Sequence, residues 1–184
     1  TPLAGQSRFG VENSAWRLPD DDEQAAMYEF AVNFLERCGY IHYETSNFAL
    51  PGCECQHNLG YWLGRDYLGL GPGAVSCLGG VRRRNVEDVD QYKALLEQGQ
   101  YPVSDCERLT AKERMSERVM LGLRLMRGFD LSQFEQEFGV RFADVYGHVV
   151  EPYLQQGILK LEEGRLKLNP EYAFVANSVL VAFV

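Results

Sequence analysis

The order of helix-capping signals after residue 109 constrains the fold more than any other feature of the chain. Thr110 and Glu113 form a Thr-x-x-Glu capping box, in which each side chain bonds the backbone N–H of the other residue at the start of a helix. We therefore expect a helix that runs to about Arg127 and ends at Gly128, since glycine suits the left-handed residue that closes a helix.

Two further helices are predicted directly after the first. Asp130 with Gln133 repeats the capping pattern and opens a short helix that should stop at Gly139. A third helix is expected over residues 142–156, where Pro152 should bend it because proline removes one backbone hydrogen bond.

The chain then changes to a pattern typical of a β-hairpin. Two β-prone runs, residues 158–161 and 165–168, flank the Glu163-Gly164 turn. A last helix is expected over residues 171–183. Three helices followed by a two-stranded wing predict a winged-helix-like domain over residues 110–184.

The first half of the chain has a different pattern. Asp20 and Glu23 predict a capped helix ending near Gly39, and residues 40–44 form a short β-prone run. Apolar residues recur at helical spacing in between, namely Met27, Ala31, Phe34, Leu35 and Cys38. A helix, a glycine and then a strand are typical of an α/β unit with a parallel sheet.

Further along, residues 67–70 could form another strand, and Asn85 is expected to cap a helix through Gln98. This helix should bury Val89, Tyr92, Leu95 and Leu96. Residues 99–109 are predicted to be a linker, because Gly99 and Pro102 lie among polar residues. The domain boundary would fall there, which gives two domains, residues 1–99 and 110–184.

Charge and hydropathy exclude two classes of partner. The net charge of the 184 residues is −8, and neither half offers the broad basic surface that nucleic-acid binding uses. Residues 142–156, which would enter a DNA groove in a winged helix, contain no Lys or Arg. No stretch is apolar for the eighteen or more residues that a membrane span needs.

Five cysteines without a secretion signal favour reduced thiols, so we expect a cytoplasmic protein.

Residues 43–74 concentrate the candidate functional groups. Cys53, Cys55 and His57 would share one face of an extended strand and could then reach one soft metal such as Zn²⁺. A closed tetrahedral site needs a fourth ligand, and neither His42 nor His148 has paired cysteines nearby. The alternative is a polar loop with incidental thiols, which we favour.

The segment His57-Asn58-Leu59-Gly60-Tyr61-Trp62 allows two interpretations. His57 could ligate haem iron, Tyr61 and Trp62 could pack on a porphyrin face, and Asn58 could orient the imidazole. Alternatively, the histidine holds the loop in place while the aromatic side chains fill the core. The spacing of these residues does not choose between the two.

Two features follow this motif. The glycine-rich turn over residues 69–74 lacks the Gly-Lys-Ser/Thr ending of a phosphate loop, so its glycines should allow positive φ or close backbone approach. Arg82 begins a run of three arginines that is either solvated surface or a clamp for a carboxylate or propionate.

Taken together, these segments resemble the C-terminal portion of oxygen-independent coproporphyrinogen III oxidase-like radical SAM proteins, in the haem chaperone branch. The resemblance rests on residues spread over most of the chain: Thr1-Pro2-Leu3, Leu18-Pro19-Asp20, Met27-Tyr28-Glu29, Gly39-Tyr40, Tyr43-Glu44, Ser46-Asn47-Phe48-Ala49, Pro51-Gly52, His57-Asn58, Tyr61-Trp62, Tyr67-Leu68-Gly69-Leu70-Gly71, Arg82, Asn85, Glu117 and Leu121-Gly122-Leu123-Arg124.

The resemblance implies an α/β (α+β) fold in which residues 1–99 belong to a partial α/β barrel and a winged-helix-like domain follows. It implies haem binding at His57, Asn58, Tyr61 and Trp62, with His57 as the axial ligand. It also implies a [4Fe-4S] cluster and S-adenosylmethionine in the intact protein, on an N-terminal radical SAM barrel. The partners would be that barrel, haem or porphyrin, and haem-acceptor proteins, with no nucleic acid.

Some residues depart from the family pattern. The cluster motif Cys-x-x-x-Cys-x-x-Cys is absent, so this chain alone should not cleave S-adenosylmethionine. Val75 stands where the family usually has His, and Thr45 where it has Ile. Two alternatives to haem trafficking stay open: part of a coproporphyrinogen III oxidase, or a non-catalytic lid that docks on the barrel.

Overall fold

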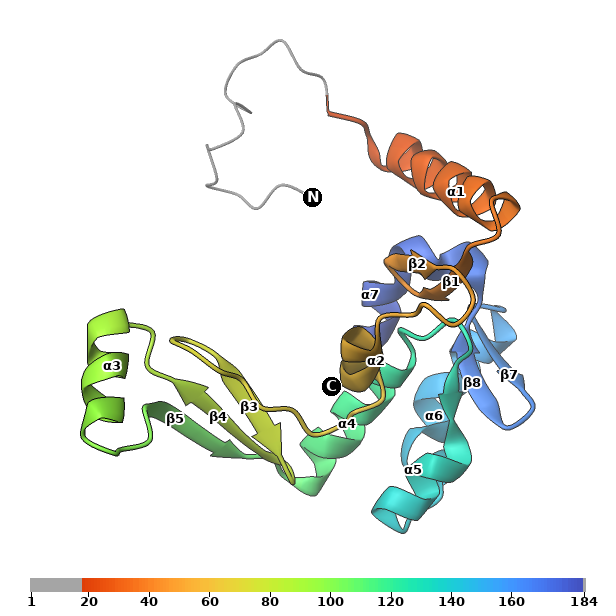
Figure 1. The fold of residues 1–184 in the computed structure, drawn as a ribbon. Coiled ribbons are helices and arrows are strands. Elements are labelled where there is room, and N and C mark those ends of the chain that lie inside the picture. The colour runs from red at the N-terminus through yellow and green to blue at the C-terminus, as the bar shows by residue number, and fades with distance from the viewer. Residues whose placement is uncertain (1–17, 184) are drawn as a thin grey trace.

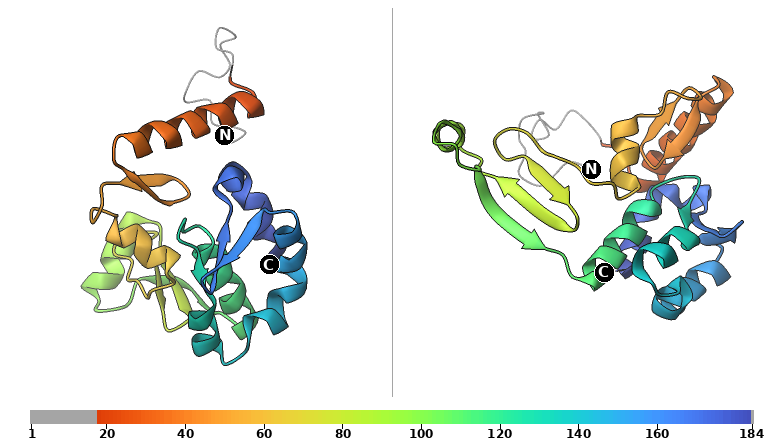
Figure 2. Two further views of the ribbon diagram at one scale, coloured as in Figure 1. Left: turned by 90° about the vertical axis from the view of Figure 1, so that its right-hand side faces the viewer. Right: turned by 60° about the horizontal axis from the view of Figure 1, so that its bottom comes forward.

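The computed structural model of the protein describes residues 18–183, and it divides into an N-terminal segment, an arm and a helical body (Figure 1). The N-terminal segment holds α1 (Asp21–Arg37), the strands β1 (Ile41–Glu44) and β2 (Asn47–Ala49), and α2 (Gln56–Trp62). The arm holds β3 (Val75–Leu78), β4 (Val81–Asn85), α3 (Val89–Glu97) and β5 (Val103–Arg108). The right-hand view of Figure 2 also shows that the arm extends away from the body.

The body is the winged-helix-like part. It holds α4 (Ala111–Gly122), β6 (Phe129–Asp130), α5 (Leu131–Phe138), α6 (Phe142–Gln155), β7 (Leu159–Glu162) and β8 (Arg165–Leu168). It ends in a 3-10 helix (Pro170–Val175), α7 (Ala176–Leu180) and a second 3-10 helix (Val181–Phe183). Three helices and a wing therefore follow one another in the predicted order, with β8 between β6 and β7 in one antiparallel sheet.

The N-caps predicted at Asp20, Thr110 and Asp130 are confirmed, whereas the one predicted at Asn85 is not. Asp20 and Glu23 form a capping box at the start of α1, and Thr110 and Glu113 form one at the start of α4. The Asp130 side chain caps α5, which ends at a left-handed Gly139. These signals act within a few residues, so the sequence alone determines them.

Several element predictions are wrong. All strand pairings among the described residues are antiparallel, so the parallel sheet is not found there; β2 follows β1 after a two-residue turn and pairs back on it. Residues 103–108 of the expected linker form β5, which pairs with β4. Residues 67–70 make only an isolated bridge, through Tyr67 and Cys77.

The helix boundaries also differ in three places. The helix after β4 is capped by Asp88 rather than Asn85, and none of its residues is buried. Helix α4 ends at Gly122 rather than near Arg127, and glycine is needed at this position because a Cβ there would lie 2.4 Å from the Phe129 ring. The expected single helix over residues 171–183 is split into a short α-helix between two 3-10 turns.

The hydrophobic core lies in the body. Fifteen buried side chains, all between Val119 and Phe183, form one cluster in which Phe129, Phe134, Phe142 and Tyr146 contact one another through their rings. The β1–β2 hairpin is joined to this body by backbone bonds, since Thr45 N donates to Arg124 O at 3.0 Å and Met126 N to Tyr43 O at 3.2 Å. No helix within residues 18–183 is long and apolar enough to cross a membrane.

Candidate functional site

Helix α2 carries the His57 motif and is closed by a Schellman motif. Gly64, at a φ of 65°, donates its N–H to the Tyr61 carbonyl at 2.9 Å, and Arg65 donates to the Gly60 carbonyl at 2.9 Å. Glycine suits this left-handed position because a Cβ is strained there. The closure fixes the backbone of Arg65 relative to the last turn of α2.

His57 and Tyr61 lie one turn apart on one face of α2. Their ring centroids are 4.8 Å apart and the rings meet edge to face. Tyr61 makes a similar contact with Tyr67, also at 4.8 Å. The His57 side chain is exposed, and it borders a shallow depression of about 200 Å³ whose lining includes Tyr61, Arg65 and Tyr67. His57 is therefore accessible to a ligand.

Asn58 and Trp62 lie on a different face from His57, since adjacent helical residues point about 100° apart. The Arg124 guanidinium stacks over the Trp62 ring at 5.3 Å, so Trp62 faces the end of α4. The Trp62 Nε1 atom is buried and has no hydrogen-bond partner within the described residues. Over the same residues no hydrogen bond joins Asn58 to His57. The structure thus brings His57 and Tyr61 together and directs Trp62 toward Arg124 instead.

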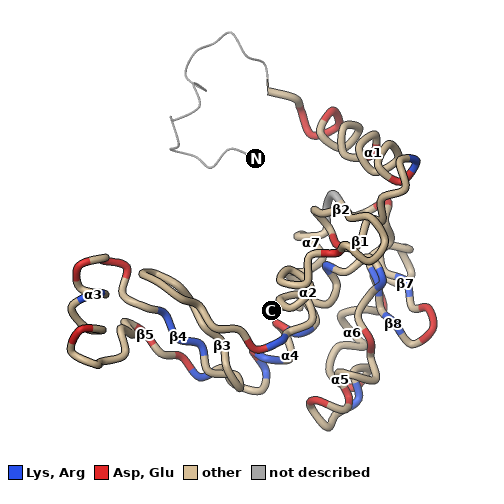
Figure 3. Tube along the Cα trace, viewed as in Figure 1, with Lys and Arg blue, Asp and Glu red and all other residues tan. Residues whose placement is uncertain are grey.

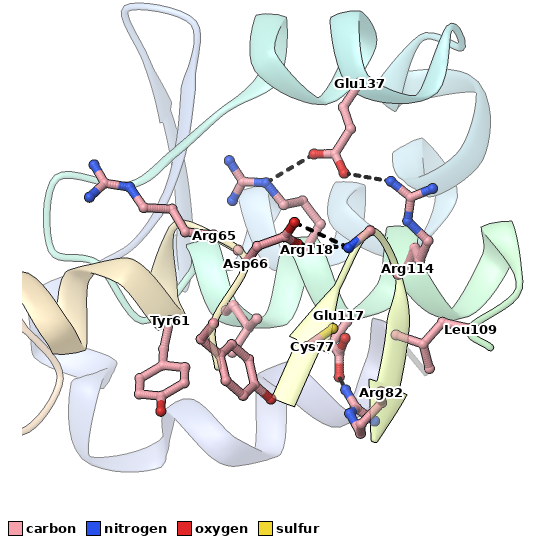
Figure 4. A pocket seen from close by; sticks show the side chains of 15 residues that line it. Tyr61, Arg65, Asp66, Cys77, Arg82, Leu109, Arg114, Glu117, Arg118 and Glu137 are labelled. Atoms are coloured by element: carbon pink, nitrogen blue, oxygen red, sulfur yellow. Dashed lines mark hydrogen bonds and ion pairs between the residues drawn. The ribbon is translucent and has the colours of Figure 1, made fainter. Parts of the chain in front are cut away.

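A second pocket, of about 250 Å³, adjoins the first (Figure 4). Tyr61, Arg65, Asp66 and Tyr67 line both pockets. The remaining walls of the second pocket come from β3, β4 and their turn and from α4 and α5, and they include five charged side chains: Arg82, Arg114, Glu117, Arg118 and Glu137. Figure 3 shows basic positions along β4 and in α4.

Arg82 is already engaged by two carboxylates of the chain. Its guanidinium forms a short ion pair with Glu117 and lies 3.6 Å from Glu107. Burial acts to lower the pKa of Arg82, but the hydrogen bond and the charge of Glu117 outweigh it, and the pKa is raised. Burial also raises the pKa of the neighbouring Cys77 thiol, which favours its protonated form.

Glu137 of α5 pairs with two arginines of α4. One of its oxygens lies 3.1 Å from Arg114 and the other 3.4 Å from Arg118, whose side chain is only 10% exposed. Burial lowers the pKa of Arg118. Asp66 accepts the Gly79 N–H with both oxygens, at 3.0 and 3.1 Å. The Glu137 pairs thus join α5 to α4 within the body, and the Asp66 bonds join the loop after α2 to the β3–β4 turn of the arm.

The metal interpretation of Cys53, Cys55 and His57 loses its geometric basis. His57 lies in a helix, while Cys53 and Cys55 are exposed residues before it, so the three do not share one face of an extended strand. Over residues 18–183 no group of three His, Cys, Asp or Glu side chains could hold a metal ion.

The glycine-rich turn shows both expected uses of glycine, since Gly71 and Gly73 have positive φ values of 102° and 68°. A Cβ at Gly69 would lie 2.3 Å from the Val75 carbonyl oxygen, so glycine is needed for close backbone approach. Thr45, which stands where the family usually has Ile, donates its hydroxyl hydrogen to the Arg124 carbonyl at 3.0 Å.

Sequence reasoning missed most of the second pocket. Glu117 is among the residues that carry the family resemblance, but its ion pair with Arg82 spans 35 positions. No sequence pattern around Arg118 or Glu137 predicts that they line this pocket, because each pairs with a residue on another helix.

The residues of α2 fit one face or edge of haem. An accessible imidazole is the kind of donor that binds haem iron, and Tyr61 provides a flat apolar surface beside it. Pockets that enclose whole ligands usually measure about 300–1,000 Å³. The two pockets are smaller, at about 200 and 250 Å³, so neither could enclose a whole porphyrin.

Comparison with known proteins gives relatives over most of the chain. The HemN C-terminal domain family matches residues 109–171. The Heme chaperone HemW of Lactococcus lactis is 35% identical over 169 residues, which are 91% of this chain and 44% of that protein. HemW of Bacillus subtilis is 32% identical over 95% of this chain and 46% of its own length. The mouse mitochondrial radical S-adenosyl methionine domain-containing protein 1 is 31% identical over 98% of this chain and 43% of its own length.

A solved structure shares the fold. Coproporphyrinogen III oxidase (HemN) from Escherichia coli, described as a radical SAM enzyme, superposes with a TM-score of 0.70 at 19% identity, over 90% of this chain and 42% of that chain. The chain thus spans less than half the length of these relatives. With its mixed helices and small sheets, the chain shares the fold of this solved structure, its sequence is similar to the C-terminal part of the Heme chaperone HemW relatives, and residues 109–171 match the HemN C-terminal domain family.

Proposed function

We propose that the protein containing this chain binds haem and transfers it to other proteins, and that α2 forms one wall of the haem site. The observation that carries this proposal is the exposed His57 imidazole in edge contact with Tyr61, above an open depression. In this arrangement His57 would ligate the haem iron and Tyr61 would pack beside the porphyrin. Bound haem would supply the iron centre, and the chain would supply the ligand and the apolar surface.

Relatives support the chaperone function over the oxidase function. Two proteins at 35% and 32% identity carry the name Heme chaperone HemW, whereas the solved coproporphyrinogen III oxidase is 19% identical and supports only the fold. We infer that the intact protein also holds a [4Fe-4S] cluster and S-adenosylmethionine outside this chain. The radical SAM barrel would then cover the haem from the other side.

The roles of Asn58 and Trp62 in this proposal differ from that of His57. Since Trp62 packs under Arg124, it would anchor α2 on the body rather than contact haem. Asn58 would lie on the neighbouring face of α2, about 100° around the helix from His57.

A hemin titration of the complete gene product tests the proposal. We expect a Soret band on binding, with an affinity about tenfold or more weaker in His57→Ala, since tenfold corresponds to only about 1.4 kcal/mol. His148→Ala is the matched control, because His148 is an exposed histidine on α6, outside both pockets. Equal titration curves for wild type and His57→Ala would rule out His57 as the ligand.

A further inference from the structure

The second pocket contains one arginine that stands apart from the others. Of the four arginines that line it, Arg82, Arg114 and Arg118 each pair with a carboxylate of the chain. For Arg65 no ion pair is found within residues 18–183. The adjacent carboxylate, Asp66, accepts the Gly79 N–H with both oxygens and so is directed toward the β3–β4 turn. Arg65 therefore carries the uncompensated positive charge of this pocket.

The backbone holds Arg65 at a fixed place relative to His57. The Schellman bonds of Gly64 and Arg65 tie the residue to the last turn of the helix that presents His57 and Tyr61. A side chain at Gly64 would press on Arg118, because its Cβ would lie 3.2 Å from the Arg118 Cδ. The turn is thus fixed on both sides, while the Arg65 side chain is exposed to solvent.

Arg65 also lies where the two pockets meet. It lines the depression beside His57 and the charged pocket next to it. Figure 4 shows its guanidinium on the outer side of the pocket, away from the Tyr61 ring. A ligand centred on His57 would thus meet Arg65 at its periphery. Tetrapyrroles of the haem type carry their carboxylates at the periphery of the ring.

We propose that Arg65 binds a peripheral carboxylate of the tetrapyrrole, and that it does so in preference to Arg82. An exposed guanidinium without a partner can donate two parallel hydrogen bonds to a carboxylate of the ligand. Arg82 would first have to release Glu117 and Glu107. The inference rests on the proposed haem function and assigns the acidic groups of the same ligand to a second residue.

The test compares iron protoporphyrin IX with its dimethyl ester, which lacks the two carboxylates. With the complete gene product, Arg65→Met should weaken binding of the acid about tenfold, since hydrogen bonds to charged groups contribute on this scale. It should leave binding of the ester unchanged. Arg65→Lys should fall between, because lysine keeps the charge and loses the two-pronged geometry. Arg83→Met, an exposed arginine of β4 outside both pockets, is the control.

The outcomes separate this inference from the proposed function. If His57→Ala loses binding while Arg65→Met binds the acid like wild type, the Arg65 assignment is wrong and haem binding at His57 stands. An equal loss for acid and ester in Arg65→Met would also overturn the assignment, because it would indicate a structural role. If wild type binds neither compound, the proposed function and this inference fail together.

Discussion

The two halves of the described chain differ in what they bury. In the C-terminal body, fifteen side chains form a closed core. Among residues 18–108 the buried apolar side chains are Ala49 and Val86, together with Pro102, while Met27, Phe30 and Phe34 of α1 are 55–71% exposed. Exposed apolar surface of this kind marks a place where another molecule or domain packs. The body is thus built to be stable by itself, and the N-terminal part to present groups to something else.

The range of the contacts also explains which elements of the fold could be predicted from the sequence. The capping boxes of α1 and α4, the Asp130 cap and the Glu163-Gly164 turn involve residues at most a few positions apart, so local chemistry determines them. Strand β5 could not be predicted in this way, because its residues are nearly all exposed and show no alternation of polar and apolar positions. Its pairing with β4 spans the whole of α3.

In the candidate site, too, the contact within one helix could be predicted from the sequence and the contacts between distant residues could not. The pairing of His57 with Tyr61 follows from helical spacing once residues 56–62 are known to be a helix. The sequence motif did not predict that Trp62 faces Arg124, or that Arg82 pairs with Glu117, since the first contact joins residues 62 positions apart and the second joins residues 35 positions apart.

The largest expected effect distinguishes the two halves directly. Phe134→Ala should cost about 3–5 kcal/mol of unfolding free energy, because Phe134 is 0% exposed and its removal leaves a cavity. Phe30→Ala, on the 71% exposed side chain of α1, should change stability by less than about 0.5 kcal/mol. Urea unfolding of this chain measures both. Equal losses would contradict the division into a closed core and an open N-terminal part.

A smaller effect is expected inside the body, where α5 packs on α4. Glu137→Gln should cost about 1–2 kcal/mol, because it leaves the largely buried Arg118 without its carboxylate. Asp144→Asn breaks the exposed pair with Arg141 and should cost roughly 0.5 kcal/mol or less. If the same urea series gives indistinguishable values for both variants, Glu137 does not stabilise the packing of α5 on α4.

The smallest effect concerns acid stability within the body. Hydrogen bonds from Ser132 hold the pKa of Asp130 below its usual value, although burial opposes this. The ionised carboxylate therefore stabilises the fold above the ordinary aspartate pKa of about 4, and this contribution disappears as the pH falls through the lower pKa of the folded state. Asp130→Ala should cost about 1 kcal/mol at pH 7 and progressively less below pH 4. A difference from wild type that stays constant down to acid pH would contradict this cause.

The most direct test of the haem account is the iron–histidine stretching band in the resonance Raman spectrum of the ferrous, haem-loaded gene product. If His57 binds the iron, we expect this band in wild type and in His148→Ala. In His57→Ala the band should be absent, and added imidazole should restore nitrogen ligation at the vacated position. An unchanged band in His57→Ala would show that another residue binds the iron, and the account of α2 as the haem wall would be wrong.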